Sequence, residues 1–212
     1  MDQLTEVRES VVSVSQDFYQ NGLVRNTGTG GNISARDPDS GLIAVTPSQV
    51  RYDTMNPEDI VMINIEGDVI EAREGLVPTS ESPTHCLIYE EFSEVYAVVH
   101  THSIFANVLG SLFDKIPAMH TEFAAFIGDS VPVAEYAQPG TEKMAKAIVE
   151  KLREAPAMVL RNHGTVAVAE DPETALNRAL AVEDTANMYY HAKVLGDPRV
   201  ISPEQSENLE EG

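Results

Sequence analysis

Two short apolar runs in this chain lead into histidines, and this feature constrains the fold most. Residues 95–99 run directly into His100 and His102, and residues 157–160 are followed closely by His163 and Gly164. If 95–99 is a strand, the alternation of its side chains puts His100 and His102 on the same face, where two ring nitrogens can meet one ion. Gly164 permits a tight turn or a close backbone approach beside His163. The pattern predicts buried segments that end at a shared histidine site.

Three neutral imidazoles favour one kind of metal. They suit Zn²⁺ and leave room for a substrate oxygen, whereas Mg²⁺ and Ca²⁺ prefer oxygen ligands. We therefore expect one catalytic Zn²⁺ per chain, held by His100, His102 and His163. An HxH pair by itself is only moderately specific, because half-buried histidines at strand ends also serve as ordinary structural residues.

The remaining periodicities indicate one α/β domain over residues 1–200. Apolar residues at helical spacing predict a helix over 3–21, and turn signals between apolar runs predict hairpins at 32–46 and 60–72. Further helices are expected at 82–92, 102–111, 140–154 and 172–195, and further strands at 95–99, 131–134, 157–160 and 166–169. Hairpins mixed with strand–helix alternation favour a three-layer α/β/α fold, in which helices cover a central, largely antiparallel sheet. Residues 201–212 are polar and acidic, and we expect a disordered tail.

The chain is strongly acidic, with 34 Asp and Glu against 14 Lys and Arg and a formal net charge of −20. Phosphate-backbone binding needs clustered basic residues, so nucleic acid is not an expected partner. A uniformly acidic, lysine-poor surface favours a halophilic protein, because salt screens self-repulsion. An acidic protein that works in dilute buffer is the alternative.

Two further properties bear on location and redox chemistry. No apolar stretch is long enough to span a bilayer, and the first residues are acidic and polar, so we expect a cytoplasmic protein without a membrane partner. Cys86 is the only cysteine, which excludes an intrachain disulfide and a thiolate metal cluster.

Five motifs in one order identify a family resemblance. They are GTGGNIS at 28–34, TPS at 46–48, PTSE at 78–81, HTH at 100–102 and NHG at 162–164. In composition and spacing the chain resembles the class II aldolase/adducin-head family, and within it the L-fuculose-1-phosphate aldolases. The resemblance extends from about Leu4 to about Asp197, nearly the whole chain.

The resemblance implies a phosphate site beside the metal. A glycine-rich turn can direct backbone N–H groups at phosphate oxygens, and nearby hydroxyl and amide groups can add donors. The implied phosphate residues are Gly31, Asn32, Ser48, Thr79 and Ser80. One departure is visible: Gln49 stands where these aldolases commonly have glycine, which puts one backbone contact to phosphate in doubt.

The resemblance makes Glu81 both a fourth metal ligand and the catalytic base. Glu81 would remove a proton from the carbon beside a ketone, while Zn²⁺ would stabilise the developing enediolate as a Lewis acid. His85, one turn further along, is interpreted as a partly exposed helix residue, with a contact to the metal ligands as the alternative.

The proton donor to the aldehyde is less defined by the sequence. Fuculose-phosphate aldolases often use a tyrosine from a neighbouring subunit, just after a PAxH string, and Thr121 occupies that position here. Glu122 is the nearest candidate acid, and His120 is the second. The family's cyclic homotetramers place active sites between subunits, so we expect the segment 121–126 to face the zinc of a neighbouring copy.

The expected activity is zinc-dependent cleavage of a ketose 1-phosphate, with L-fuculose 1-phosphate as the expected substrate and dihydroxyacetone phosphate and L-lactaldehyde as products. Pentulose-phosphate 4-epimerase and methylthioribulose-phosphate dehydratase activities on the same scaffold are the alternatives. The epimerases usually carry HSHGP where this chain has RNHGT. A non-catalytic, adducin-head-like assembly module is a third possibility, although such modules generally lack the metal histidines.

Overall fold

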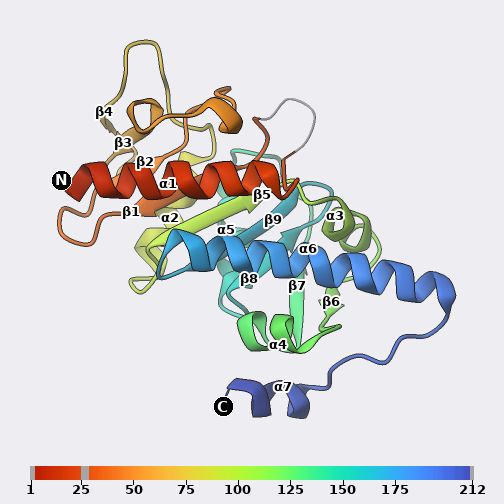
Figure 1. Cartoon of the computed structure of the whole chain (residues 1–212). Helices are drawn as coiled ribbons and strands as arrows, with labels where there is room; N and C mark the ends of the chain where they lie inside the picture. Colours follow the sequence, from red (N-terminus) through yellow and green to blue (C-terminus); the bar gives the residue numbers. More distant parts are fainter. Residues whose placement is uncertain (1–2, 25–28, 211–212) are drawn as a thin grey trace.

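A nine-stranded sheet forms the middle of the molecule in the computed structural model, which describes residues 3–24 and 29–210 (Figure 1). The strands are β1 (Asn32–Arg36), β2 (Ile43–Val45), β3 (Val61–Ile63), β4 (Val69–Glu71), β5 (Ala97–Thr101), β6 (Lys115–Pro117), β7 (Ser130–Ala134), β8 (Ala157–Leu160) and β9 (Gly164–Ala169). The helices are α1 (Gln3–Gln20), α2 (Ser82–Glu91), α3 (Ile104–Gly110), α4 (Thr121–Ile127), α5 (Glu142–Leu152), α6 (Pro172–Leu195) and α7 (Pro203–Glu210), with short 3-10 turns at Tyr52–Thr54 and Pro57–Asp59.

The strand order is β4-β3-β2-β1-β5-β9-β8-β7-β6. Neighbouring strands pair antiparallel except β7 and β8, which pair in parallel. The largely antiparallel sheet expected from the sequence is therefore confirmed. Its central strands, β1, β5 and β9, are hydrogen-bonded in register, with Asn32 opposite His100 and His100 opposite Val166.

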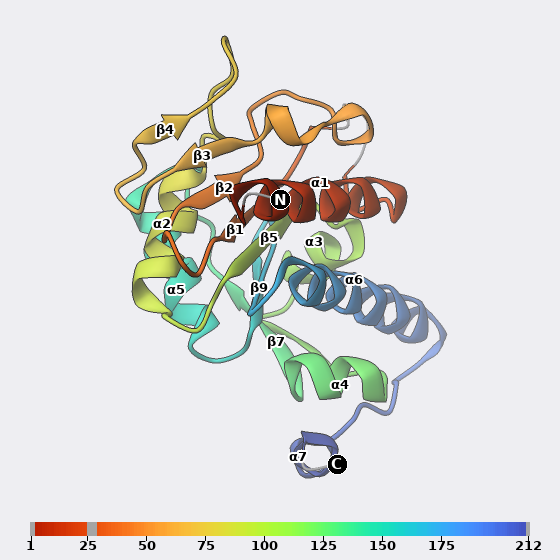
Figure 2. The same cartoon turned by 60° about the vertical axis from the view of Figure 1, so that its left-hand side comes forward.

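Side chains of the central strands alternate between two apolar cores. On β5, Ala97 and Val99 join the core beneath α1, α3, α4 and α6, whereas Val98 joins the core beneath α2 and α5. Each core consists mainly of buried aliphatic side chains, and one core lies on each face of the sheet. Helices thus cover both faces, as Figure 2 shows with α1 and α6 on one side and α2 and α5 on the other.

Several helix starts follow from local capping chemistry. Thr141 accepts a hydrogen bond from the Met144 backbone at the start of α5, and Asp171 does the same from Thr174 at the start of α6. The carboxylate of Glu183, on α6, accepts hydrogen bonds from the backbone N–H groups of residues 104, 105 and 106. This contact ties the first turn of α3, just after the histidine pair, to the longest helix.

Three elements were not expected. β6 is only three residues long, and α4 and α7 are short helices of seven and eight residues. The expectation of a disordered tail is wrong for 203–210, which form α7 beside α4 (Figure 1). The Ile201 backbone N–H donates to the Ala118 carbonyl, and Ser206 is buried. These contacts with the rest of the domain order the segment despite its polar composition. Among the described residues, no helix is long and apolar enough to cross a bilayer.

Gly164 is required by the close approach of β9 to β5. A Cβ atom at this position would lie 1.9 Å from the Thr101 carbonyl oxygen, so a side chain would force the two strands apart. We expect Gly164→Ala to lower the free energy of unfolding by about 2–4 kcal/mol. Urea unfolding followed by circular dichroism would measure the change.

Gly196→Ala is the matched control, because a Cβ atom there meets nothing within 4 Å. It should change the free energy of unfolding by less than about 0.5 kcal/mol. Equal stabilities of the two variants would contradict the steric argument.

Candidate active site

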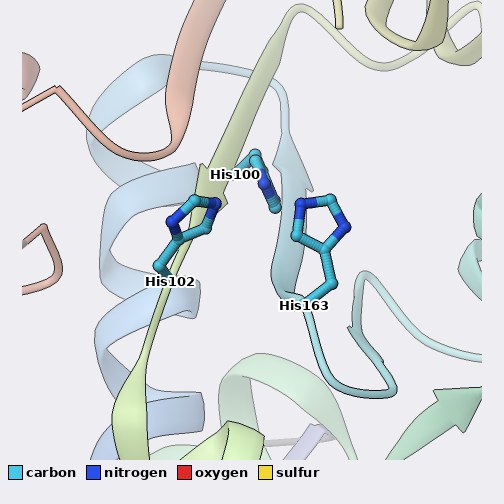
Figure 3. A group of neighbouring side chains, drawn as sticks. All are labelled: His100, His102 and His163. Atoms are coloured by element: carbon cyan, nitrogen blue, oxygen red, sulfur yellow. The ribbon is translucent and has the colours of Figure 1, made fainter. Parts of the chain in front are cut away.

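Three histidines converge at the end of β5 and the start of β9. His100 lies on β5, His102 follows it, and His163 lies in the turn that leads into β9. One ligand nitrogen from each ring lies within 4.8 Å of the others, and the ring centroids are 4.8–5.5 Å apart. Figure 3 shows the rings turned toward a common centre. The pairing of adjacent strands thus brings together residues about sixty positions apart.

The hydrogen bonding of His100 fits a bound cation. Its Nδ1 lies 2.9 Å from the Thr165 carbonyl oxygen, which can only accept, so Nδ1 carries the proton. Burial lowers the pKa of His100 to about 3, so the ring is neutral and Nε2 is a bare lone pair. This buried Nε2 has no hydrogen-bond partner and faces the Glu81 carboxylate at 3.3 Å. Two facing acceptors repel each other unless a cation lies between them.

Glu81 borders two of the three histidines. Its carboxylate oxygens lie 3.3 Å from His100 Nε2 and 3.4 Å from His163 Nε2. The residue is the N-cap of α2 and is largely buried, but its side chain forms no capping hydrogen bond and is left for the site. The pKa of His102 is also lowered, mainly by burial and to a smaller extent by the nearby His163. Three imidazoles and one carboxylate form a donor set suited to a zinc-like dication.

A cleft of about 580 Å³ joins the histidines to the glycine-rich turn. Its lining includes all five residues expected to bind phosphate, together with Glu81, His102 and His163: Gly31, Asn32, Ser48, Thr79 and Ser80. No Lys or Arg lines this cleft among the described residues. An anion would therefore be held by N–H and hydroxyl donors. Gly28, the first residue of the glycine-rich motif, lies outside the described residues.

The loops that carry the hydroxyl groups are tied together. The Ser48 Oγ donates to the Pro78 carbonyl at 3.0 Å, and Pro47 and Pro78 form an isolated bridge. The backbone N–H groups of Ser48 and Thr79 donate to Val77 and Thr46 and are not free for an anion. The Thr79 and Ser80 hydroxyls, rather than these two backbone groups, are left to donate into the cleft, whereas the Ser48 hydroxyl would have to exchange its Pro78 acceptor for a phosphate oxygen.

Gln49 has a left-handed backbone, with φ of 64°, and it lines the cleft. Glycine adopts this conformation without the steric cost that Cβ imposes, which explains why glycine is common at this position in the aldolases that the chain resembles. We expect Gln49→Gly to raise the free energy of unfolding by about 0.5–1 kcal/mol, measured by thermal or urea unfolding.

Gln49→Ala serves as the control, since it removes the side chain but keeps Cβ. It should leave the stability within about 0.5 kcal/mol of the parent. If alanine stabilised as much as glycine, the effect would come from the lost side chain and the backbone argument would be wrong.

Glu122 does not line its own cleft. It lies in the first turn of α4, close to β6 and β7 at the end of the sheet, and it is exposed. His120 caps the same helix by accepting a hydrogen bond from the Phe123 backbone at 3.3 Å. Within one chain, neither candidate proton donor meets the histidine site.

His85 differs from the sequence interpretation. It is 2% exposed rather than partly exposed, and both ring nitrogens have hydrogen-bond partners, Ser34 and Asn32. The signal that could have identified it is its spacing, because Glu81, His85 and Tyr89 follow one another at four-residue intervals on one helix face.

Comparisons with known proteins agree with this geometry. The family model described as class II aldolase and adducin N-terminal domain matches residues 9–190. A 5-deoxy-D-ribulose 1-phosphate aldolase of Bacillus thuringiensis is 36% identical, covering 97% of this chain and 94% of that protein. An L-ribulose-5-phosphate 4-epimerase of Salmonella paratyphi C is 31% identical, covering 90% of this chain and 86% of its own length.

A solved structure with the same fold is described as an L-fuculose 1-phosphate aldolase. It superimposes with a TM-score of 0.89 at 33% identity, and the match covers 97% of this chain and 95% of that one. Together with the histidine cluster, these matches confirm the resemblance read from the sequence. The chain belongs to the class II aldolase and adducin family, and it is an enzyme of the class II, metal-dependent lyase type.

Proposed function

We propose that the protein is a zinc-dependent aldolase that reversibly cleaves a ketose 1-phosphate into dihydroxyacetone phosphate and an aldehyde. The observation that carries this proposal is the single cleft in which hydroxyl and amide donors lead directly to Glu81 and the histidines. This order matches a substrate whose phosphate, ketone and reacting carbon are adjacent. Two substrates follow from the resemblances: L-fuculose 1-phosphate, which releases L-lactaldehyde, and 5-deoxyribulose 1-phosphate, which releases acetaldehyde.

The residues divide the chemistry between them. Gly31, Ser48, Thr79 and Ser80 would bind the phosphate, with Asn32 between them and the metal ligands. In the direction of synthesis, Glu81 removes the proton from C3 of dihydroxyacetone phosphate, and in cleavage it returns a proton to that carbon. A zinc ion held by Glu81, His100, His102 and His163 would supply Lewis-acid stabilisation of the negative charge that develops on the substrate.

A substrate panel tests the proposal. Zinc-loaded protein is incubated with L-fuculose 1-phosphate, 5-deoxyribulose 1-phosphate and L-ribulose 5-phosphate, and dihydroxyacetone phosphate is measured by its coupled reduction. We expect release from at least one of the two 1-phosphates, and loss of this activity after chelation. No release from either, with or without zinc, would reject the proposal.

A 4-epimerase is the second candidate, favoured by the relative from Salmonella. In its substrate, L-ribulose 5-phosphate, the phosphate lies at the far end of the sugar from the ketone, so the anion donors would hold the aldehyde fragment instead. Conversion of L-ribulose 5-phosphate to its C4 epimer, without net release of either fragment, would establish this activity. The RNHGT string, in place of HSHGP, favours the aldolase.

We also propose a homotetramer, in which the segment 121–126 of one copy faces the cleft of the next. The support is that Glu122 is exposed and does not line its own cleft, while no Tyr, Lys or Cys is among the described residues that line it. In molar KCl we expect light scattering to report about four times the mass of the chain, with dissociation at low salt because the charge of −20 is then poorly screened. A fully active monomer would contradict the shared site.

The same salt series tests the halophilic proposal. Activity and stability should rise from dilute buffer to molar KCl, since screening relieves the repulsion among acidic side chains. Full activity and stability in dilute buffer would identify an ordinary acidic protein.

The non-catalytic alternative has its own outcome. If the purified protein assembled but bound no metal and had no activity, an adducin-like assembly module would be the better interpretation.

A further inference from the structure

A continuous hydrogen-bonded chain of buried side chains leads away from Glu81 into the core. Asn32 Nδ2 donates to Glu81 Oε2 at 2.9 Å, and Asn32 Oδ1 lies 2.5 Å from His85 Nε2. His85 Nδ1 lies 2.6 Å from Ser34 Oγ, which lies 2.8 Å from the Tyr89 hydroxyl. Beyond Glu81, every member of the chain is at most 4% exposed.

The spacing of two elements produces this chain. Asn32 and Ser34 are two residues apart on β1 and lie on one face of the strand, while Glu81, His85 and Tyr89 are four residues apart along α2. Two strand residues advance by about 6.7 Å and four helical residues by about 6 Å, so the side chains of the two elements interleave.

The donors and acceptors fix the direction of every bond. A carboxylate only accepts, so the Asn32 amide turns its NH₂ toward Glu81 and its oxygen toward His85. That oxygen also only accepts, so His85 Nε2 carries the proton. In a neutral ring Nδ1 is then bare and accepts from the Ser34 hydroxyl, which in turn accepts from Tyr89.

The neutral state of His85 follows from its surroundings. Burial lowers the pKa of His85 to about 4, and Glu81 only partly offsets this effect. The Tyr89 proton is directed to Ser34 at 2.8 Å rather than to the Tyr96 carbonyl at 3.5 Å. Each polar side-chain atom of Asn32, Ser34, His85 and Tyr89 thus has at least one hydrogen-bond partner.

We propose that His85 is a positioning residue, whose Nε2–H tautomer locks the Asn32 amide so that its NH₂ group holds the Glu81 carboxylate in place. Without this donor the amide can rotate and direct its oxygen at the carboxylate, and the two acceptors would repel each other. The catalytic consequence rests on the proposed aldolase function, whereas the tautomer and the amide orientation do not.

The first experiment measures the tautomer directly. Protein labelled with ¹⁵N-histidine, zinc-loaded and again after chelation, is studied by long-range ¹H–¹⁵N correlation spectroscopy, with His85→Gln used to assign the signals. We expect His85 to be protonated at Nε2 and bare at Nδ1 in both states. The Nδ1–H tautomer, or a doubly protonated ring at neutral pH, would overturn the proposal.

The second experiment compares variants in the aldol reaction. His85→Leu removes the donor to Asn32, and we expect kcat to fall about 10–100-fold with KM within about threefold and zinc content unchanged. His85→Gln keeps an N–H donor near the position of Nε2 and should restore kcat to within about threefold of the parent. Cys86→Ala, a substitution of a buried residue on the same helix whose thiol contacts the Asn64 carbonyl and not the hydrogen-bonded chain, is the control for a loss of packing.

The outcomes separate the two proposals. An unchanged kcat in His85→Leu, or an equal loss in Cys86→Ala, would overturn the positioning role. If His85→Leu does not fold, the tautomer measurement on the parent decides. A parent protein that shows the Nε2–H tautomer but cleaves no ketose 1-phosphate would reject the proposed function and leave the amide-locking role intact.

Discussion

Replacing His100 by alanine is expected to remove the bound metal and to reduce aldolase activity by more than about a thousandfold. Loss of residues that merely support metal ligands already costs about 10–100-fold, and His100 is expected to be a ligand itself. Its ring is oriented by Thr165, and its buried Nε2 faces Glu81 without a hydrogen-bond partner, so this nitrogen is left for the metal. Elemental analysis of the purified variant and turnover of the ketose 1-phosphate would measure both effects.

His191→Ala is the matched control for His100→Ala. His191 is exposed on α6, where its ring contacts Phe105 and Tyr190, and it is not in the cleft. It should keep stoichiometric zinc and activity within about twofold of the parent. A His100→Ala protein with normal zinc content and turnover would show that the metal site is assigned wrongly.

Glu81→Gln should slow proton transfer strongly while leaving substrate binding intact. The amide keeps the shape of the side chain but cannot accept the proton from C3, so exchange of that proton with solvent should slow by about 10²–10⁴-fold. The measurement is loss of deuterium from specifically labelled dihydroxyacetone phosphate, with binding followed by calorimetry.

Glu90→Gln is the comparison for Glu81→Gln, because Glu90 lies on the same helix but is exposed and outside the cleft. In Glu90→Gln, the rate of exchange of the C3 proton with solvent should match that of the parent. Undiminished exchange in Glu81→Gln would exclude Glu81 as the base and would make a histidine of the site the candidate base.

Much of the fold could be predicted because its apolar pattern is local. The long helix 172–195 was predicted with its observed bounds, and strands 157–160 and 131–134 differ from the observed strands by at most one residue. α4 and β6 were missed because each is short: seven residues of α4 and three of β6 are too few to establish a helical or an alternating period, although α4 is largely apolar. α7 was missed because it is held by its contacts with α4, which are tertiary and cannot be inferred from the polar composition of the segment.

The site was predictable only in part. The sequence grouped the three histidines, since they flank apolar runs, and motif order added Glu81 and the phosphate residues. It misjudged His85, because burial of a helix face depends on the strand packed against it. The relation of Glu122 to a cleft depends on copies of the chain that one sequence does not describe.

The position of the histidines on paired central strands has a kinetic consequence. His100 pairs with Val166 and Thr101 with Thr165, and both strands are covered by helices on either side of the sheet. Opening this pair requires most of the sheet to open, so its amides should be among the slowest to exchange with deuterated solvent. A metal ion held there would leave through the mouth of the cleft rather than by fraying of the backbone. Its rate of loss should therefore depend on what occupies the cleft, and a bound phosphate ester should slow the release of the ion by closing this exit.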